Sequence, residues 1–204
     1  MQNIVNFILE LDKLKSVTRK TSLLNGERYE NSAEHSWQIA MLASSLAPYA
    51  AGDATKPVDI NRVIAMLLVH DIGEIDTGDT IVYQEEGLAD RKLAEQQAVA
   101  RIFGLLGSAE HKPYAEELMT LWLEFERAET AEARFAHAAD RAMPVLLNLA
   151  NKGQSWVENG IRYEQVIRKI KTPIQAGCPA LWDYLEVELD AARGKGYFDD
   201  EISD

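Results

Sequence analysis

The sequence predicts an all-α protein, a single-domain helical bundle, on three observations. Its 204 residues are 47% hydrophobic, which is enough to bury one sizeable core. Apolar side chains recur at the 3.6-residue period of a helix along most of the chain, and no alternating pattern is long enough for a sheet. We therefore expect one helical domain over residues 1–193 and a polar, acidic C-terminal tail over residues 194–204.

The N-terminal quarter predicts two helices joined by a polar connection. Residues 3–15 carry their apolar side chains in one helical stripe. Residues 16–31 are polar, and Asn25-Gly26 marks a turn within this segment. The second helix is expected to run to about residue 50, and either Asn31 or Ser32 can cap its start.

The helical pattern continues through the rest of the chain. Asp59 can cap a helix from Ile60 to about Ile72, and its nearly all-apolar middle is typical of a central helix. Gly73 and Gly78 bracket a short loop. The remaining helices are expected over residues 88–106, 111–127, 131–151, 160–171 and 179–193.

The composition argues against several classes of protein. A net charge of -12, with no basic stripe to offset it, opposes binding of DNA or RNA. No apolar run approaches the roughly 20 residues of a membrane helix, and the N-terminus lacks the features of a signal peptide. The single cysteine, Cys178, is typical of a protein of the reducing cytoplasm. There is no P-loop, dinucleotide-binding glycine motif, His-Glu-x-x-His motif or nucleophile elbow.

Four ionisable residues occupy positions where a helical core should be apolar: His35, His70, Asp71 and Asp140. A lone histidine on an apolar face is usually a hydrogen-bonded core residue, and a lone aspartate is often a buried cap. Burying four such groups apart would be costly, whereas one shared divalent cation removes the cost. Two imidazoles and two carboxylates suit Mn, Co, Mg, Zn, Fe or Ni. The conjunction therefore favours a single metal site.

The order of these residues and the strings around them resemble the HD-domain metal-dependent phosphohydrolase superfamily. The strings are Asn-Ser-Ala-Glu-His-Ser (31–36), Leu-Val-His-Asp-Ile-Gly-Glu (68–74), Thr-Gly-Asp (77–79) and Ala-Ala-Asp (138–140). Over about residues 5–190 the chain is similar to the branch of bacterial 5′-deoxynucleotidases and their eukaryotic HD-containing relatives. The resemblance implies a helical fold, one divalent ion held by the four residues, hydrolysis of nucleoside 5′-monophosphates and a homodimer.

Three further residues match positions of that branch. Glu74 lies one helical turn after His70, so it can project to the same side and transfer protons one water away from the metal. The resemblance gives Glu74 this catalytic role, and Asp79 a contact with the substrate sugar or an organising role. It implies that Arg19 binds the substrate phosphate, a contact that suits the paired N–H groups of a guanidinium. Without the resemblance, these residues would be interpreted as a loop carboxylate, a turn residue and a surface arginine.

The chain departs from that branch at Lys20. The deoxynucleotidases have a tryptophan directly after the matching arginine, and that tryptophan helps to recognise the sugar. Lys20 instead adds a second cation beside the substrate phosphate, which an acidic protein needs for an anionic ligand. We therefore predict that Lys20 binds substrate and that discrimination between ribose and deoxyribose is weak.

Some alternatives stay open at the level of sequence. A few HD proteins hold two metals through extra histidines, and His111 and His137 are the candidates here, although His111 falls at a helix start. Two metals, iron in particular, would indicate an oxygenase. An HD site could also cleave phosphodiesters or triphosphates, or the chain could be a nonenzymatic helical module with a vestigial metal site.

Overall fold

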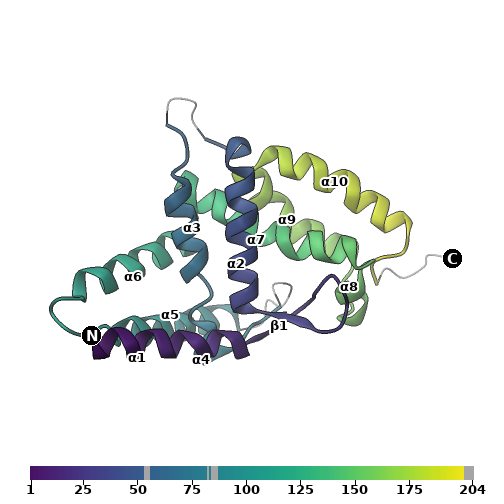
Figure 1. Cartoon of the computed structure of the whole chain (residues 1–204). Coiled ribbons are helices and arrows are strands. Elements are labelled where there is room, and N and C mark those ends of the chain that lie inside the picture. The colour runs from purple at the N-terminus through teal and green to yellow at the C-terminus, as the bar shows by residue number, and fades with distance from the viewer. Residues whose placement is uncertain (53–55, 82, 84–86, 200–204) are drawn as a thin grey trace.

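The computed structural model of the protein is built almost entirely of helices, which confirms the predicted all-α class (Figure 1). It describes residues 1–52, 56–81, 83 and 87–199. The chain begins with α1 (Gln2–Leu11), the 3-10 turn η1 (Asp12–Ser16) and a two-stranded antiparallel sheet of β1 (Thr18–Ser22) and β2 (Tyr29–Asn31). The elements that follow are α2 (Ser32–Leu46), η2 (Ala47–Tyr49), α3 (Ile60–Val69), α4 (Glu74–Thr77), α5 (Leu88–Gly104), α6 (Lys112–Arg127), α7 (Ala131–Ala150), α8 (Gln154–Glu158), α9 (Tyr163–Gly177) and α10 (Pro179–Gly194).

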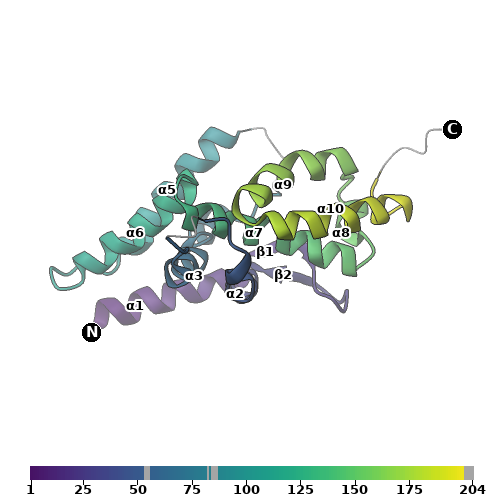
Figure 2. The same cartoon turned by 90° about the horizontal axis from the view of Figure 1, so that it is seen from above.

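Helix α7 forms the centre of the molecule, because it packs against α2, α3, α6 and α9. Seen from above, α2, α3 and α7 lie in the middle, with α5 and α6 on one side and α9 and α10 on the other (Figure 2). Small side chains allow the close approach of α9: a Cβ on Gly177 would lie 2.1 Å from the carbonyl oxygen of Arg134. The predicted central helix, α3, also joins the core through Val63, Met66 and Leu67.

Two predicted helix caps are confirmed. The Asn31 side chain accepts a hydrogen bond from the Glu34 N–H at 2.9 Å, and the Glu34 carboxylate accepts one from the Asn31 N–H at 3.1 Å. Asp59 accepts hydrogen bonds from the backbone N–H groups of Asn61 and Arg62 and so caps α3. The first cap matters for the site, since it fixes the turn of α2 that carries His35.

The turn predicted at Asn25-Gly26 is confirmed, since Gly26 has a positive φ of 69°, but the hairpin that β1 and β2 form around it was not predicted. The strands do not need an alternation of apolar side chains, because polar contacts with neighbouring helices hold them in place. The Ser22 N–H donates to Ser155 Oγ at 3.2 Å, and Asn151 Nδ2 donates to the Ser22 and Leu23 carbonyls at 3.1 and 2.8 Å. A strand held by hydrogen bonds to neighbouring helices carries no hydrophobic signal in its sequence.

Other predicted boundaries need correction. The expected loop between Gly73 and Gly78 contains the single-turn helix α4, since Gly73 has right-handed helical dihedrals. A side chain at Gly73 would also crowd α5, with its Cβ 3.0 Å from the Glu95 carbonyl. The helix predicted over 160–171 starts at Tyr163 and continues through an internal proline to Gly177. Helix α8 was not predicted.

The start of the predicted C-terminal tail is anchored to the domain. Phe198 is buried and stacks on Trp156 with ring centres 4.4 Å apart. Residues 200–204 of the tail lie outside the described residues. None of the helices in the described part of the chain has the length and apolar character that crossing a membrane requires.

Candidate metal centre

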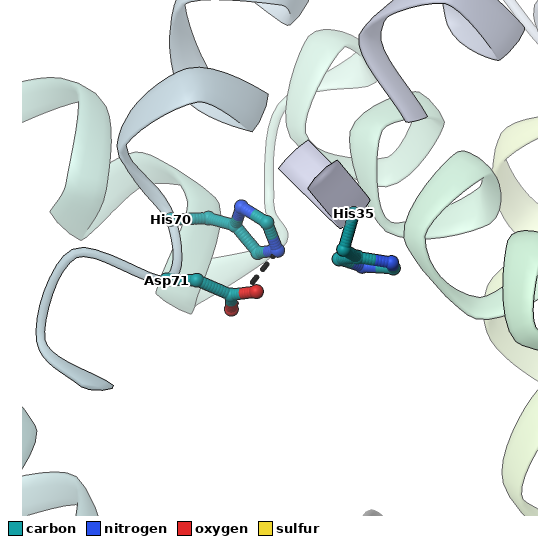
Figure 3. A group of neighbouring side chains, drawn as sticks. All are labelled: His35, His70 and Asp71. Atoms are coloured by element: carbon teal, nitrogen blue, oxygen red, sulfur yellow. Dashed lines mark ion pairs between the residues drawn. The ribbon is translucent and has the colours of Figure 1, made fainter. Parts of the chain in front are cut away.

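Two histidines and an aspartate meet where the start of α2 lies beside the end of α3. His35 lies in the first turn of α2, His70 ends α3, and Asp71 follows in the next turn (Figure 3). One ligand atom from each lies within 4.8 Å of the others. Both imidazoles are buried, His35 completely. The structure therefore brings His35 together with His70 and Asp71, which lie 35 and 36 positions further along the sequence.

Asp140 of α7 borders the same group. It is not part of the mutually close set of three, but its Oδ1 lies 3.1 Å from His35 Nε2 and 3.8 Å from His70 Nε2. Asp140 is buried on the face of α7 that also carries Ala136, Met143 and Leu147, as its helical spacing predicted. All four residues singled out from the sequence thus surround one space.

The donor atoms of this group fit a divalent cation. His70 Nδ1 donates to the Leu67 carbonyl at 2.9 Å, so Nε2 carries the lone pair of a neutral imidazole. This buried Nε2 has no hydrogen-bond partner among the described residues and lies 3.0 Å from Asp71 Oδ1. A lone pair facing a carboxylate oxygen is repulsive, and a cation between them makes both contacts favourable. The residues present therefore fit a metal ion.

The carboxylates around this space differ in their pKa values. Without a metal, burial disfavours the charged form of Asp71, but the charges of a protonated His70 and of Arg19 outweigh it and lower the pKa of Asp71 to about 2. Burial likewise opposes the ionisation of Asp140, yet Arg141 and His35 hold its pKa well below the ordinary value. Burial together with the charge of Asp71 instead raises the pKa of Glu74 to about 9. Two ionised ligands therefore lie near a carboxyl group that readily holds a proton.

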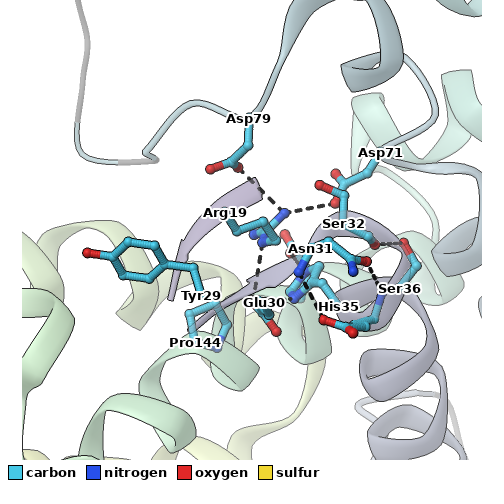
Figure 4. Close-up of polar contacts among 12 residues, drawn as sticks. Arg19, Tyr29, Glu30, Asn31, Ser32, His35, Ser36, Asp71, Asp79 and Pro144 are labelled. Carbon is cyan, nitrogen blue, oxygen red and sulfur yellow. Dashed lines mark hydrogen bonds and ion pairs between the residues drawn. The ribbon is translucent and has the colours of Figure 1, made fainter. Parts of the chain in front are cut away.

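Arg19 lies over this acidic group rather than on the surface. It belongs to β1 and only 13% of its side chain is exposed. Its NH1 atom is 2.9 Å from Asp71 Oδ2 and 3.6 Å from Asp79 Oδ1 (Figure 4). The same atom is 3.9 Å from Glu74 Oε1. The predicted phosphate-binding residue and the two predicted acids thus lie together beside the metal-capable residues.

Glu74 and Asp79 are also more than a loop carboxylate and a turn residue. Glu74 begins α4, and Ser32 Oγ donates to its Oε2 at 2.6 Å. Asp79 follows Gly78, whose positive φ of 75° reverses the chain after α4. The side chain of Asp79 is only 8% exposed, and burial raises its pKa. Both carboxyl groups are therefore held close to Arg19.

A cavity of about 270 Å³ connects these groups to an apolar interior. All but one of the residues expected at the site line it: Arg19, Lys20, His70, Asp71, Glu74, Asp79 and Asp140. The exception is His35, which is completely buried behind them. From Asp140 to Asn148 the lining follows one face of α7 for about 12 Å, the rise of eight helical residues. Apolar side chains from beyond α7 complete the lining, namely Trp156, Ile161 and Ile170. The cavity therefore offers a charged region and an apolar one to a single ligand.

The remaining predicted candidates differ in their positions. Lys20 is exposed on β1, with its Nζ 5.9 Å from the centre of the Tyr29 ring. His137 Nε2 donates to the Phe125 carbonyl at 2.8 Å, and His111 lies directly before α6, with no capping hydrogen bond from its side chain. Neither of these histidines belongs to the one metal-capable group found among the described residues. Cys178 is free and buried where α9 meets α10, and burial raises the pKa of its thiol.

Sequence reasoning did not identify two residues of the site, Glu30 and Ser32. Glu30 of β2 is completely buried beside Arg19 and His35, and Ser32 holds Glu74. Ser32 lay within the string used for the family resemblance, but it was considered only as a helix cap. Glu30 precedes that string in a polar segment, where nothing in a single sequence distinguishes a buried acid from an exposed one.

An all-helical core, a buried cluster of histidine and aspartate, and an adjoining cavity with a buried arginine define a class of protein: a helical metalloprotein with a cavity beside its metal-capable residues. The family can then be stated. The model of the HD domain matches residues 11–182, and the chain belongs to the HD-domain family. This confirms the resemblance found in the sequence.

Several known proteins are similar to the chain. One solved structure, described as a "predicted metal-dependent phosphohydrolase" from Magnetospirillum magnetotacticum MS-1, is 42% identical, with 98% of each chain covered and a TM-score of 0.87. The 5′-deoxynucleotidase HDDC2 of Dictyostelium discoideum is 28% identical over 148 residues, which are 72% of this chain and 76% of that protein. A 5′-deoxynucleotidase of Enterobacter sp. (strain 638) is 32% identical over 102 residues, which are 46% of this chain and 51% of its own.

Proposed function

We propose that the protein is a metal-dependent phosphomonoesterase that hydrolyses nucleoside 5′-monophosphates to nucleoside and phosphate. The observation that carries the proposal is the placement of Arg19, with its NH1 2.9 Å from the ligand candidate Asp71, in the lining of the cavity. Relatives named 5′-deoxynucleotidase and a solved phosphohydrolase relative support the same class of reaction.

In this proposal His35, His70, Asp71 and Asp140 hold one divalent ion. Bound there, the ion supplies Lewis-acid chemistry, which polarises a phosphoryl oxygen and acidifies water. His70 contributes its Nε2, because its Nδ1 is engaged with the Leu67 carbonyl. Any of Mn, Co, Mg, Zn, Fe or Ni suits this mixture of nitrogen and oxygen ligands.

Arg19 binds the phosphate of the substrate. Its NH1 group is held among Asp71, Asp79 and Glu74, so the guanidinium is already oriented beside the metal-capable residues. A phosphate dianion next to it adds charge-assisted hydrogen bonds. As the P–O5′ bond breaks, Arg19 stabilises the charge that develops on the transferred phosphoryl oxygens.

Glu74 transfers the proton. The oxygen of water forms a bond to phosphorus, the bond from phosphorus to O5′ breaks, and the proton lost by water ends on O5′ of the nucleoside. The Ser32 hydroxyl holds Oε2 of Glu74, while Oε1 lies 3.9 Å from Arg19 NH1, on the side of the proposed phosphate site. Asp79 and Lys20 contact the sugar and phosphate, and the apolar part of the cavity takes the base.

The direct test is an assay of phosphate release by the purified protein. The panel holds ribo- and deoxynucleoside mono-, di- and triphosphates and a phosphodiester, each with several divalent metals. We expect release of inorganic phosphate from the monophosphates with at least one metal, and none after chelation. Activity confined to the phosphodiester or to triphosphates would contradict the proposal and favour another HD reaction. No turnover with any metal would favour a nonenzymatic role.

We further propose that the chain acts as a homodimer in the cytoplasm. Trp37 and Met41 are one turn apart and exposed on α2, and Leu68 is exposed on the adjacent helix α3. Exposed large apolar side chains on neighbouring helices are typical of an interface between subunits. Sedimentation should give twice the chain mass of 22.8 kDa, and Trp37→Glu should shift it toward the monomer. A native monomer would contradict the dimer.

The proposed cytoplasmic location rests on the single cysteine. The free, buried Cys178 is consistent with a reducing compartment.

A further inference from the structure

Glu30 is a buried carboxylate at the junction of the metal centre and the proposed phosphate site. It lies on β2, directly before the residue that caps α2, and none of its side chain is exposed. Its Oε1 is 3.3 Å from Arg19 Nε and 3.4 Å from His35 Nδ1 (Figure 4). Neither oxygen of Glu30 makes a regular hydrogen bond among the described residues. One carboxylate oxygen therefore faces two residues of the site at ion-pair distance.

The contact with His35 determines which of its nitrogens can bind metal. The imidazole has Nδ1 toward Glu30 and Nε2 toward Asp140, at 3.4 and 3.1 Å. A carboxylate beside Nδ1 stabilises the proton there, so that Nε2 keeps its lone pair for the ion. The same carboxylate makes the imidazole a stronger ligand. The ring of His35 is thus held between an orienting acid and a ligand acid.

The contact with Arg19 orients the guanidinium. Glu30 faces Nε, while NH1 of the same group is directed toward Asp71 and Asp79. The hairpin creates this arrangement, because Thr18 pairs with Asn31 and the next residues on the two strands are Arg19 and Glu30. Because Glu30 pairs with Nε, the terminal N–H groups of Arg19 can face Asp71, Asp79 and the cavity.

We propose that Glu30 is a positioning residue that couples the two halves of the site, orienting His35 for the metal and Arg19 for the phosphate. This inference rests on the proposed function for the phosphate half only. The metal half depends on the donor atoms of His35 and is measurable without turnover. A carboxylate that served packing alone would not need to lie against both functional groups through one oxygen.

The experiment compares Glu30→Gln, Glu30→Asp and the matched control Glu27→Gln, an exposed acid in the connection of the same hairpin. Dissociation constants are measured for Zn²⁺ by competition with a chromophoric chelator, and for inorganic phosphate by calorimetry on the Zn²⁺-loaded protein. We expect Glu30→Gln to weaken Zn²⁺ binding about 10- to 100-fold, the usual cost of losing a partner of a metal-bound histidine. Phosphate binding should weaken as well, Glu30→Asp should recover part of both losses, and Glu27→Gln should match the native protein.

Native Zn²⁺ and phosphate affinities in a folded Glu30→Gln would overturn the proposal, and loss of metal affinity alone would overturn the coupling to Arg19. If Glu30→Gln does not fold, the native protein still decides the metal half. Long-range ¹H–¹⁵N spectra of the Zn²⁺-loaded protein should show the His35 proton on Nδ1, and a proton on Nε2 would refute the orientation. Because these readouts need no turnover, failure of this inference is distinguishable from failure of the proposed reaction.

Discussion

The metal side of the site and its substrate side are built from different kinds of structure. His35, His70 and Asp140 belong to three core helices, α2, α3 and α7, which pack against one another. Arg19, Lys20 and Asp79 come from a short hairpin and from the turn after a four-residue helix. The metal side therefore belongs to the rigid hydrophobic core, while the hairpin of the substrate side is held largely by polar contacts.

This difference predicts that substitutions on the two sides have different effects, a division between metal binding and substrate choice. Changes on the metal side should abolish the reaction, because a buried ligand has no substitute within the core. Changes on the substrate side should alter which substrates are accepted, most clearly at Lys20, because this exposed residue can vary without cost to the core. The variants below test this division, from the largest expected effect to the smallest.

Replacing a ligand should have the largest effect. Asp71→Ala removes a carboxylate that lies 3.0 Å from His70 Nε2 and 2.9 Å from Arg19 NH1. We expect the variant to lose its metal and essentially all hydrolysis, since both the ion and Arg19 lose a partner. Elemental analysis of the native and variant proteins measures the metal directly. Undiminished metal in Asp71→Ala would remove this residue from the ligand set.

Glu74→Gln should separate catalysis from binding. The amide keeps the shape of the side chain and can still accept the hydrogen bond from Ser32. It cannot take a proton, so we expect kcat to fall about 10²-fold or more, as for a lost general acid–base group. Metal content and the far-ultraviolet circular dichroism should stay native. Near-native turnover with metal bound would show that Glu74 does not take part in the reaction.

The same substitution should stabilise the metal-free protein in a pH-dependent way. The pKa of Glu74 is raised from 4.5 to about 9, chiefly by burial, so the folded state holds a proton that the unfolded state has released. The contribution of Glu74 to stability therefore falls as pH rises through this window. We expect the Tm of Glu74→Gln to exceed the native Tm by a margin that grows from pH 6 to pH 9, with chelator present. A margin that does not change with pH would contradict this assignment.

The sequence predicted the metal side far better than the substrate side, for a physical reason. His35 and Asp140 stand out because helical spacing places them among aliphatic residues, and this contrast is visible in one sequence. The hairpin has no such contrast, since its backbone accepts hydrogen bonds from Asn151 and donates one to Ser155. Glu30 was missed for the same reason, because its burial depends on segments far away in the chain.

The roles of Arg19 and Asp79 came from the family resemblance and not from their own pattern. Their spacing in the sequence, 60 residues apart, gives no sign that NH1 and Oδ1 approach to 3.6 Å. Only the packing of the hairpin against the turn after α4 creates that proximity. A family motif supplies such tertiary information because it summarises structures in which the contact already exists.

Lys20 should have the smallest effect, and it tests the substrate side alone. Its side chain is exposed on β1 and lines the cavity, with Nζ 5.9 Å from the Tyr29 ring centre. A flat indole at this position could pack on the sugar and make a 2′-hydroxyl unwelcome, whereas a flexible ammonium can move aside or donate to that hydroxyl. We therefore expect kcat/KM for ribo- and deoxyribonucleoside monophosphates to differ by less than about tenfold, or about 1.4 kcal/mol of transition-state binding.

Paired assays of AMP with dAMP and of UMP with dUMP measure this ratio, and Lys20→Trp should raise it in favour of the deoxy substrates while the metal content stays native. A native preference of about a hundredfold for the deoxy substrates, well beyond that tenfold limit, would mean that another residue does the work of the missing tryptophan. The substrate side would then be as tightly specified as the metal side, and the proposed division between them would fail.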